Sequence, residues 1–306
     1  MARYAHVFES AMSVKFVRVT TESLRMLADV VGDAAVTLDR GYLSARVKSS
    51  YREAVNSGSL LGLRYAADEL RARSATAPGA MVIRCGPAVF NVHPHVRVAL
   101  CTALCTLVGH PFRVFDRWEL WRPLGVDLGV SPSRATGVGY IPFHIDIVNS
   151  ERPPDYVAFF CERADPLGGG QTIVSNLLAA YARLSPEDRR VMSEAVFREG
   201  RFHDLSSVGR ELNPFPVFAQ EHGSTRVRFT AKMLPAMPAG AQKTALSRYL
   251  QLLEDARTMV PLIEGDLLII NQWVAAHGRL PLGDAQGGIL EAERRLILQA
   301  FVAADD

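Results

Sequence analysis

The sequence has little of what a membrane protein or a nucleic-acid-binding protein needs. Its 34 Lys and Arg residues nearly balance its 32 Asp and Glu residues, so the formal net charge is only +2. These charges are scattered along the chain and do not form the basic stripe that marks a nucleic-acid-binding surface. The most apolar long stretch, residues 96–108, is about half of the ~20 residues that a membrane-spanning helix requires, and Arg97 interrupts it. We therefore expect neither nucleic acid nor a membrane as a partner.

Cysteine is also scarce, and the amino terminus carries no recognisable signal peptide. The four cysteines form no CxxC pair, and Cys101 and Cys105 have the spacing of one helix face. A chain of 306 residues can bury a full core without disulfides, so we expect buried free thiols in a reducing compartment. Residues 1–16 lack the apolar run and the small-residue cleavage site of a signal peptide. The sequence therefore predicts a cytoplasmic protein.

Internal repeats and low-complexity tracts are absent from the sequence, which excludes solenoids and propellers. The composition, with 48% hydrophobic and 22% charged residues, is typical of a globular protein. The length allows two domains, but no linker divides the chain, and single β domains of about 200–250 residues are common. We therefore expect one domain that spans residues 1–306. The sequence does not indicate an oligomeric state.

The first part of the chain, about residues 1–110, is mainly helical by its apolar periodicity. Turn residues interrupt the second of its helical stretches, and a Gly-Pro pair follows its last short strand. The expected helices cover residues 21–31, 43–73 with a break near 56–58, and 95–108, and the expected strands cover residues 14–19 and 81–84.

The remainder, about residues 111–306, is rich in short strands. The expected strands cover residues 143–148, 156–161, 171–174, 226–230, 266–271 and 296–302, with helices at 186–197 and 239–259 and a long loop at 123–142. Strands and helices do not alternate regularly, which argues against a doubly wound parallel sheet. The pattern favours a closed or double-sheet antiparallel β architecture, with the helical N-terminal part packed on its outside.

One histidine has a carboxylate neighbour that suits metal binding. Of the eight histidines, only His144 is followed two residues later by a carboxylate, that of Asp146. On a strand, residues i and i+2 point to the same face, so both side chains can reach one metal ion. His277 is the best third ligand, because the apolar run 266–271 places it just beyond the end of a strand. Two histidines and one carboxylate leave positions open on a metal, as in non-haem Fe(II) oxygenases.

Two other histidine pairs are weaker candidates for a metal site. His93 and His95 flank a proline and open a helix, so a solvated helix terminus is the simpler interpretation. His203 and Asp204 are adjacent, and adjacent residues of a strand point to opposite faces. For the His-x-Asp pair itself, the alternative is a buried core histidine beside a turn-capping aspartate.

Several short motifs occur together in an order that resembles one enzyme family. The segments are residues 143–146 (FHID), 154–161, 168–172 (GGGQT), 277–279 (HGR) and 294–295 (RR), preceded by the strand 81–84. In order and spacing they resemble the taurine dioxygenase and clavaminate synthase-like family of iron(II)- and 2-oxoglutarate-dependent oxygenases. The resemblance covers about residues 82–302 and implies a double-stranded β-helix, a jelly-roll or cupin-like core.

The resemblance also implies roles for individual residues. His144, Asp146 and His277 would bind the iron, Arg295 would bind the far carboxylate of 2-oxoglutarate, and Thr172 would assist it. A guanidinium suits that role, because it donates two parallel charge-assisted hydrogen bonds to a carboxylate. Outside the resemblance, Thr172 could simply begin a strand, and Arg295 could form a surface ion pair.

Strand alternation lets only one of Arg294 and Arg295 face inward. We favour Arg295, because Ile297 and Gln299 then share its face. In taurine-oxidising members a second arginine lies four residues further on, where this chain has Gln299. A sulfonate substrate is therefore not expected. The candidate substrate contacts are Gln299, Phe143 and Arg279.

By resemblance, the predicted activity uses Fe(II), 2-oxoglutarate and O2 and releases succinate and CO2. It would oxidise an unactivated C–H bond, most simply by hydroxylation, of a small amino-acid- or peptide-derived molecule in specialised metabolism. The alternatives are a non-catalytic jelly-roll protein that binds a metal or ligand, and a zinc hydrolase with the same three ligands. A hydrolase leaves Thr172 and Arg295 unexplained. Residues 123–142 and 205–238 are the candidate lid over the site.

Overall fold

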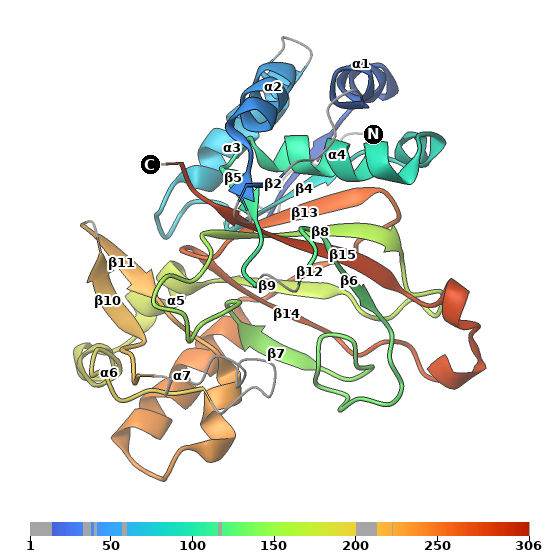
Figure 1. The fold of residues 1–306 in the computed structure, drawn as a ribbon. Coiled ribbons are helices and arrows are strands. Elements are labelled where there is room, and N and C mark those ends of the chain that lie inside the picture. Colours follow the sequence, from blue (N-terminus) through green and yellow to red (C-terminus); the bar gives the residue numbers. More distant parts are fainter. Residues whose placement is uncertain are drawn as a thin grey trace, which may run out of the picture.

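The protein consists of two stacked β-sheets with helices on both outer sides (Figure 1). Within the described residues of this computed structural model, the strands form sheets of nine, four and two strands. No helix of these residues is long and apolar enough to cross a membrane. The described residues are 14–32, 38–39, 42–56, 60–115, 118–199, 213–221 and 223–305.

The large sheet has the order β1-β4-β13-β8-β15-β5-β3-β2, and β6 also pairs with β15. Its strands pair antiparallel except for β1 and β4, which run parallel. The strands are β1 (Val14–Arg18), β2 (Leu38–Asp39), β3 (Tyr42–Leu43), β4 (Ala80–Arg84), β5 (His110–Phe112), β6 (Arg122–Gly125), β8 (Tyr156–Arg163), β13 (Asp266–Asn271) and β15 (Leu296–Ala303).

The smaller sheet has the order β12-β9-β14-β7, and all its pairs are antiparallel. A separate hairpin forms the third sheet. The strands are β7 (Ile141–His144), β9 (Thr172–Asn176), β12 (Thr258–Val260) and β14 (Ala275–Arg279), and the hairpin is β10 (Phe218–Glu221) with β11 (Ser224–Val227).

Strand β13 shows why the large sheet is apolar on both faces. Leu267 and Ile269 pack into the core beneath the N-terminal helices, whereas Leu268 and Ile270 pack between the two sheets. All six residues of the strand are buried. A strand covered on both faces reads as a continuous apolar run, which is how residues 266–271 appear in the sequence.

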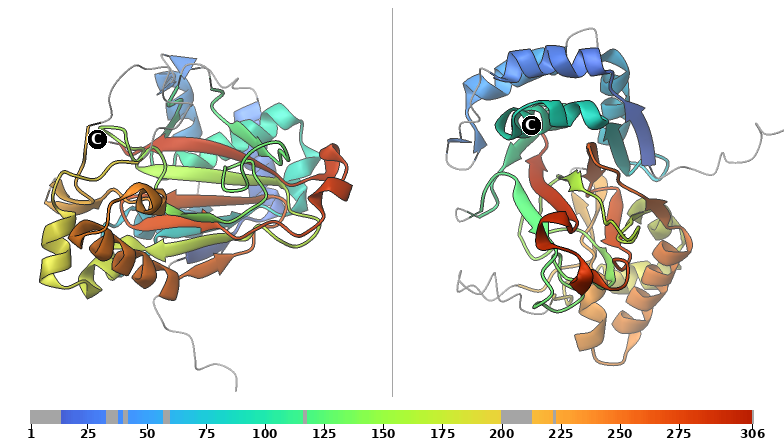
Figure 2. Two further views of the ribbon diagram at one scale, coloured as in Figure 1. Left: turned by 90° about the horizontal axis from the view of Figure 1, so that it is seen from below. Right: turned by 90° about the vertical axis from the view of Figure 1, so that its right-hand side faces the viewer.

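Four helices cover the outer face of the large sheet (Figures 1 and 2). They are α1 (Thr21–Gly32), α2 (Ala45–Val55), α3 (Leu61–Arg71) and α4 (Pro94–Cys105). Their buried residues share one apolar core with residues of β4, β8, β13 and β15. Because β1 and β4 belong to this sheet, the N-terminal part contributes strands as well as helices. The single-domain organisation stays a prediction.

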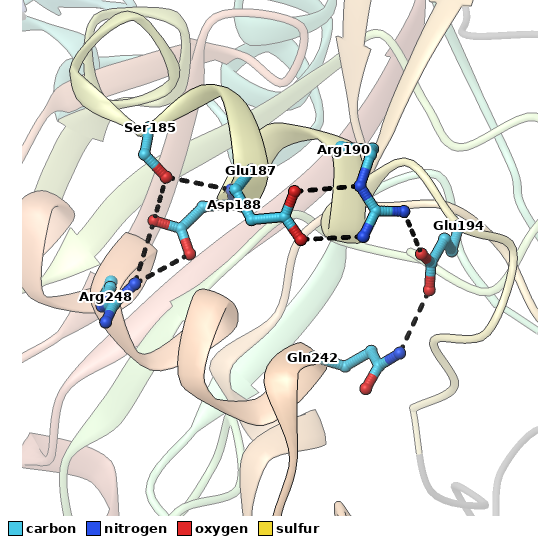
Figure 3. A network of polar contacts seen from close by, with 7 residues as sticks. All are labelled: Ser185, Glu187, Asp188, Arg190, Glu194, Gln242 and Arg248. Carbon is cyan, nitrogen blue, oxygen red and sulfur yellow. Dashed lines mark hydrogen bonds and ion pairs between the residues drawn. The ribbon is translucent and has the colours of Figure 1, made fainter.

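Three further helices, α5 (Leu177–Arg183), α6 (Pro186–Met192) and α7 (Ala241–Asp255), pack with the smaller sheet around a second core. Polar contacts connect α6 and the residues after it to α7 (Figure 3). Arg248 Nη1 donates to Asp188 at 3.1 Å, and Gln242 Nε2 donates to Glu194 at 3.1 Å. Ser185 caps α6 by accepting a hydrogen bond from the Asp188 N–H.

Some predicted boundaries were wrong. The helix predicted at residues 186–197 ends at Met192, and that predicted at 239–259 ends at Asp255. Residues 258–260 instead form β12, which pairs with β9. The strand predicted at 143–148 ends at His144, because the chain turns there and Ile147 adopts a positive φ of 55°. All four cysteines are buried and free.

Candidate metal centre

The two histidines of the predicted site lie directly opposite each other on neighbouring strands. His144 is the last residue of β7, and His277 is the central residue of β14. Opposite residues of an antiparallel pair point to the same face, and the ring centroids are 4.5 Å apart. His277 lies beyond the end of β13, as predicted, but the sequence analysis did not predict that it lies within a further strand, β14.

Asp146 reaches the histidines by a route that the sequence did not indicate. It does not share a strand with His144, because β7 has already ended and the Ile145 N–H donates to the Phe229 carbonyl. Even so, its Oδ2 lies 3.4 Å from His277 Nε2 and its Oδ1 lies 3.7 Å from His144 Nε2. The three side chains form a group whose ligand atoms lie within 4.8 Å of one another.

The protonation states of His144 and Asp146 suit a divalent metal ion. Burial, together with His277, lowers the pKa of His144 to about 3. Burial raises the pKa of Asp146, but the neighbouring His277, His144 and Lys232 together outweigh this and the resulting pKa is about 2. Neutral imidazole and ionised carboxylate are the forms that bind metals. His144 Nδ1 lies 2.9 Å from the Pro142 carbonyl, which leaves Nε2 for the metal.

The donor set itself fits iron(II). Two imidazoles and one carboxylate are the facial set of non-haem iron sites, and three protein ligands leave positions open for small molecules. The group opens onto a cavity of about 530 Å³, which has room for such molecules. The buried His277 Nδ1 has no hydrogen-bond partner among the described residues.

Thr172 and Arg295 line the same cavity. Thr172 begins β9 and pairs with Arg279 of β14, two residues from His277. The Arg295 side chain is nine-tenths buried, and burial lowers its pKa to about 10, although Asp165 counteracts this in part. A buried guanidinium needs an anionic partner, which a bound carboxylate would supply.

Ile297 and Gln299 line the cavity together with Arg295, as strand alternation predicts. Arg294 points elsewhere, and its Nε donates to the carbonyl oxygen of Ile289. The structure therefore directs Arg295 into the cavity.

The glycine-rich turn before Thr172 is held by the Asp165 carboxylate. It accepts hydrogen bonds from the N–H groups of Gly169 at 3.0 Å and Gly283 at 2.7 Å. Gly170 has a φ of 71°, and a Cβ added there would lie 2.5 Å from a leucine side chain and 3.4 Å from Arg295. Glycine is thus required at this turn, both for its backbone conformation and for the close packing beside Arg295.

The three predicted substrate contacts have different positions. Gln299 lines the cavity, but its Nε2 donates to Asp146 Oδ2 at 3.2 Å. Arg279 also lines it, and its guanidinium donates to carbonyls of the 123–142 loop, which it holds in place. Phe143 is fully buried in the core beneath α5 and α7. The placement of Phe143 at the substrate was wrong, because His144 takes the cavity face of β7 and its neighbour points away.

The sequence analysis missed four charged cavity residues, the arginines Arg122 and Arg134 and the pair Glu199 and Lys232, which lies beside Asp146. Glu199 lies in the connection after α6, and Asn149 Nδ2 donates to it at 3.4 Å. Lys232 follows Thr230, which forms a β-bridge with His144. Burial raises the pKa of Glu199 to about 7. Glu199 and Lys232 come from segments without a motif, so no sequence signal could have identified them.

The two predicted lid segments both contribute to the cavity. The ends of the predicted 123–142 loop belong to β6 and β7; between these strands, residues 130, 131 and 133–136 line the cavity, and Lys232 comes from the 205–238 segment. Residues 205–212 lie outside the described residues, as do His203 and Asp204. His93 and His95 are exposed at the start of α4, where the His95 N–H donates to His93 Nδ1.

Comparison with known proteins identifies the family. Residues 122–299 match the taurine catabolism dioxygenase TauD, TfdA family, a match over more than half of the chain. The protein belongs to the TauD/TfdA family. Clavaminate synthase 2 of Streptomyces clavuligerus is 26% identical over 164 residues, which cover 51% of this chain and 49% of that protein. The alpha-ketoglutarate-dependent dioxygenase cnsM of Penicillium expansum is 33% identical over 88 residues, 28% of this chain and 21% of that protein. The chain thus spans about half or less of the curated relatives it matches.

Solved structures confirm the fold of this TauD/TfdA member. Asparagine oxygenase in complex with Fe(II), 3-hydroxyasparagine and succinate superposes with a TM-score of 0.74, at 19% identity and over 94% of this chain and 93% of that one. The non-haem iron oxygenase OrfP in complex with Fe and alpha-ketoglutaric acid has a TM-score of 0.70, at 17% identity over 95% of this chain and 94% of that one. The predicted family and the predicted jelly-roll core are both confirmed.

Proposed function

We propose that this protein is an Fe(II)- and 2-oxoglutarate-dependent oxygenase that hydroxylates a C–H bond of a small amino-acid- or peptide-derived molecule. One observation carries the proposal. His144, Asp146 and His277 converge at a cavity that also contains the buried guanidinium of Arg295. A metal-binding triad and a buried cation in one cavity are what a metal-chelating dicarboxylate requires. The family match supports the same activity.

In this proposal each residue has a defined task. His144, Asp146 and His277 hold the iron, which together with 2-oxoglutarate activates O2 for C–H oxidation when both are bound. Arg295 binds the far carboxylate of 2-oxoglutarate through two parallel hydrogen bonds, and the Thr172 hydroxyl adds another. Apolar cavity residues exclude water from the reacting atoms; they include Phe159, Leu262, Ile297 and Phe301.

The proposed substrate class rests on Glu199 and Lys232. These two residues bring opposite charges to the cavity wall beside Asp146. An amino acid also has opposite charges a few bonds apart, so its ammonium group can face Glu199 and its carboxylate can face Lys232. Structures of relatives contain 3-hydroxyasparagine and (3S)-hydroxy-L-Arg, which supports an amino-acid-derived substrate here. Gln299 occupies the position of the taurine enzymes' sulfonate-binding arginine, so we do not propose a sulfonate.

An anaerobic titration tests the cosubstrate. Fe(II) and then 2-oxoglutarate are added to the apoprotein, and the visible spectrum is recorded for the wild type and for Arg295→Ala. We expect a weak metal-to-ligand charge-transfer band that requires both additions and is lost in the variant. A folded protein that gives no band but binds zinc tightly would favour the hydrolase or the non-catalytic binding protein.

A reducing compartment such as the cytoplasm is also part of the proposal. It is supported by the four cysteines, which are buried and free. Thiols stay reduced in the cytoplasm, whereas disulfides form and persist in oxidising compartments.

A further inference from the structure

Asp146 is held differently from the two histidines beside it. His144 and His277 belong to paired strands, whose backbone hydrogen bonds fix their positions. Asp146 follows the end of β7, and the next residue, Ile147, has a positive φ. A carboxylate on such a turn needs other contacts to keep its orientation, because strand pairing does not provide them.

Gln272 fixes the backbone of Asp146. It lies in the turn between β13 and β14, is completely buried, and its Oε1 accepts a hydrogen bond from the Asp146 N–H. Its Nε2 donates to the Pro154 carbonyl at 2.9 Å, and its own N–H donates to the Asp155 carbonyl at 2.8 Å. One amide thus ties both ends of the connection between β7 and β8 to the turn that precedes the strand of His277.

Gln299 fixes the carboxylate itself. It lies on β15 of the large sheet, is 7% exposed, and its Nε2 donates to Asp146 Oδ2 at 3.2 Å. Its strand neighbours in register are Phe159 and Arg122, so it reaches the carboxylate from the sheet opposite β7. When one oxygen of a carboxylate accepts a hydrogen bond, only its other oxygen is fully available to a metal ion.

We propose that Gln299 and Gln272 are positioning residues of the metal centre, which orient the Asp146 carboxylate so that one oxygen is offered to the metal. The inference rests on the proposed function, because it assumes that the three side chains bind a metal. It gives Gln299 a role at a ligand instead of the predicted role at the substrate. A carboxylate that binds through one oxygen also keeps a coordination position open for 2-oxoglutarate or O2.

Cobalt(II) binding to the apoprotein tests this role, with Gln299→Met as the main variant. Methionine has nearly the same length but no N–H donor, so it removes the hydrogen bond with little change in volume. We expect the Kd for cobalt(II), measured by titration of its visible bands, to rise about 10- to 100-fold, the usual effect of losing a partner of a metal ligand. Gln251→Met is the matched control, since Gln251 is exposed on α7, and its Kd should equal that of the wild type.

Melting temperatures separate positioning from general stabilisation. Without metal, Gln299→Met should melt close to the wild type, and the rise in Tm caused by a fixed cobalt(II) concentration should be smaller, because this stabilisation falls with the logarithm of the Kd. Gln272→Met, whose side chain is fully buried, should lose both apoprotein stability and affinity. Unchanged cobalt(II) affinity in Gln299→Met, or a loss explained entirely by a lower apoprotein Tm, would refute the positioning role. A wild-type protein that binds no cobalt(II) would refute the metal centre itself.

Discussion

Arg295→Met should weaken 2-oxoglutarate binding and at the same time stabilise the protein without ligands. The Arg295 guanidinium lies in the cavity with only a tenth of its side chain exposed. In the proposed complex it makes two charge-assisted hydrogen bonds to a carboxylate, each worth about 1.5–3 kcal/mol. Their loss should cost at least about 3 kcal/mol, which is roughly 100-fold or more in the Kd for 2-oxoglutarate.

The expected gain in stability follows from the cost of burying a charge. Burial lowers the pKa of Arg295 from its usual value to about 10, so the charged form is disfavoured in the folded protein. One pKa unit corresponds to 1.36 kcal/mol, so the cost is on the order of 3 kcal/mol. This cost of burying the charge is fully present below about pH 10 and declines as the pH rises from about 10 toward the pKa of arginine in the unfolded chain. An apolar side chain of similar length removes this cost, so the Tm of the apoprotein should rise by about 2–6 °C.

Two measurements on one variant check this argument. Isothermal titration with Fe(II)-loaded, anaerobic protein gives the Kd for 2-oxoglutarate, and differential scanning calorimetry gives the Tm of the apoprotein. Arg294→Met is the control, because Arg294 donates to a backbone carbonyl and does not line the cavity. The reasoning is refuted if Arg295→Met binds 2-oxoglutarate within threefold of the wild type, or if its apoprotein melts well below the wild type.

Three further variants test the site. His277→Ala should abolish substrate-dependent succinate formation, whereas the control His93→Ala, at the exposed start of α4, should retain it. Succinate formation at the wild-type rate by His277→Ala would disprove the ligand assignment. Gly170→Ala should lower the free energy of unfolding by about 1–3 kcal/mol, because its φ is positive and its Cβ would overlap a leucine; unfolding in urea at an unchanged midpoint would contradict this. Glu199→Gln should raise the KM for an amino-acid substrate found by screening about tenfold, with little change in kcat. The pKa of Glu199 is about 7, so the wild-type KM should fall as the pH rises through 7 and Glu199 ionises, and this pH dependence should be missing in the variant.

The sequence predicted the three side chains that the structure brings together in the candidate metal centre, but not the way the chain positions them. His144, Asp146 and His277 were identified by the order and spacing of short motifs, which depend on chemistry more than on local conformation. Residues 145–148 combine two isoleucines and a valine and therefore favour a strand, yet the backbone turns there and Ile147 takes a positive φ. Contacts with residues distant in sequence, such as Gln272, decide this turn, and local propensity contains no information about them.

Contacts between residues distant in sequence also explain the other differences between the predicted and the observed structure. The apolar spacing of residues 239–259 suits one long helix, but the last residues pair with β9 because an edge of the smaller sheet is available to them. Phe143 was a predicted substrate contact, but strand alternation sends it and its neighbour His144 to opposite faces of β7. Glu199 enters the cavity from an irregular connection and Lys232 from a short 3-10 helix, and only the folded chain brings them together.

The direct pairing of His144 with His277 makes the metal site sensitive to the register of the sheet. The two residues are more than a hundred positions apart in the sequence, and they face each other only when β7 and β14 are aligned as observed. A slip of one residue would turn one imidazole to the opposite face of the sheet and remove it from the site. Metal binding at the proposed centre would therefore select one strand alignment over its neighbours, and the appearance of metal affinity during refolding would report when β7 and β14 have paired.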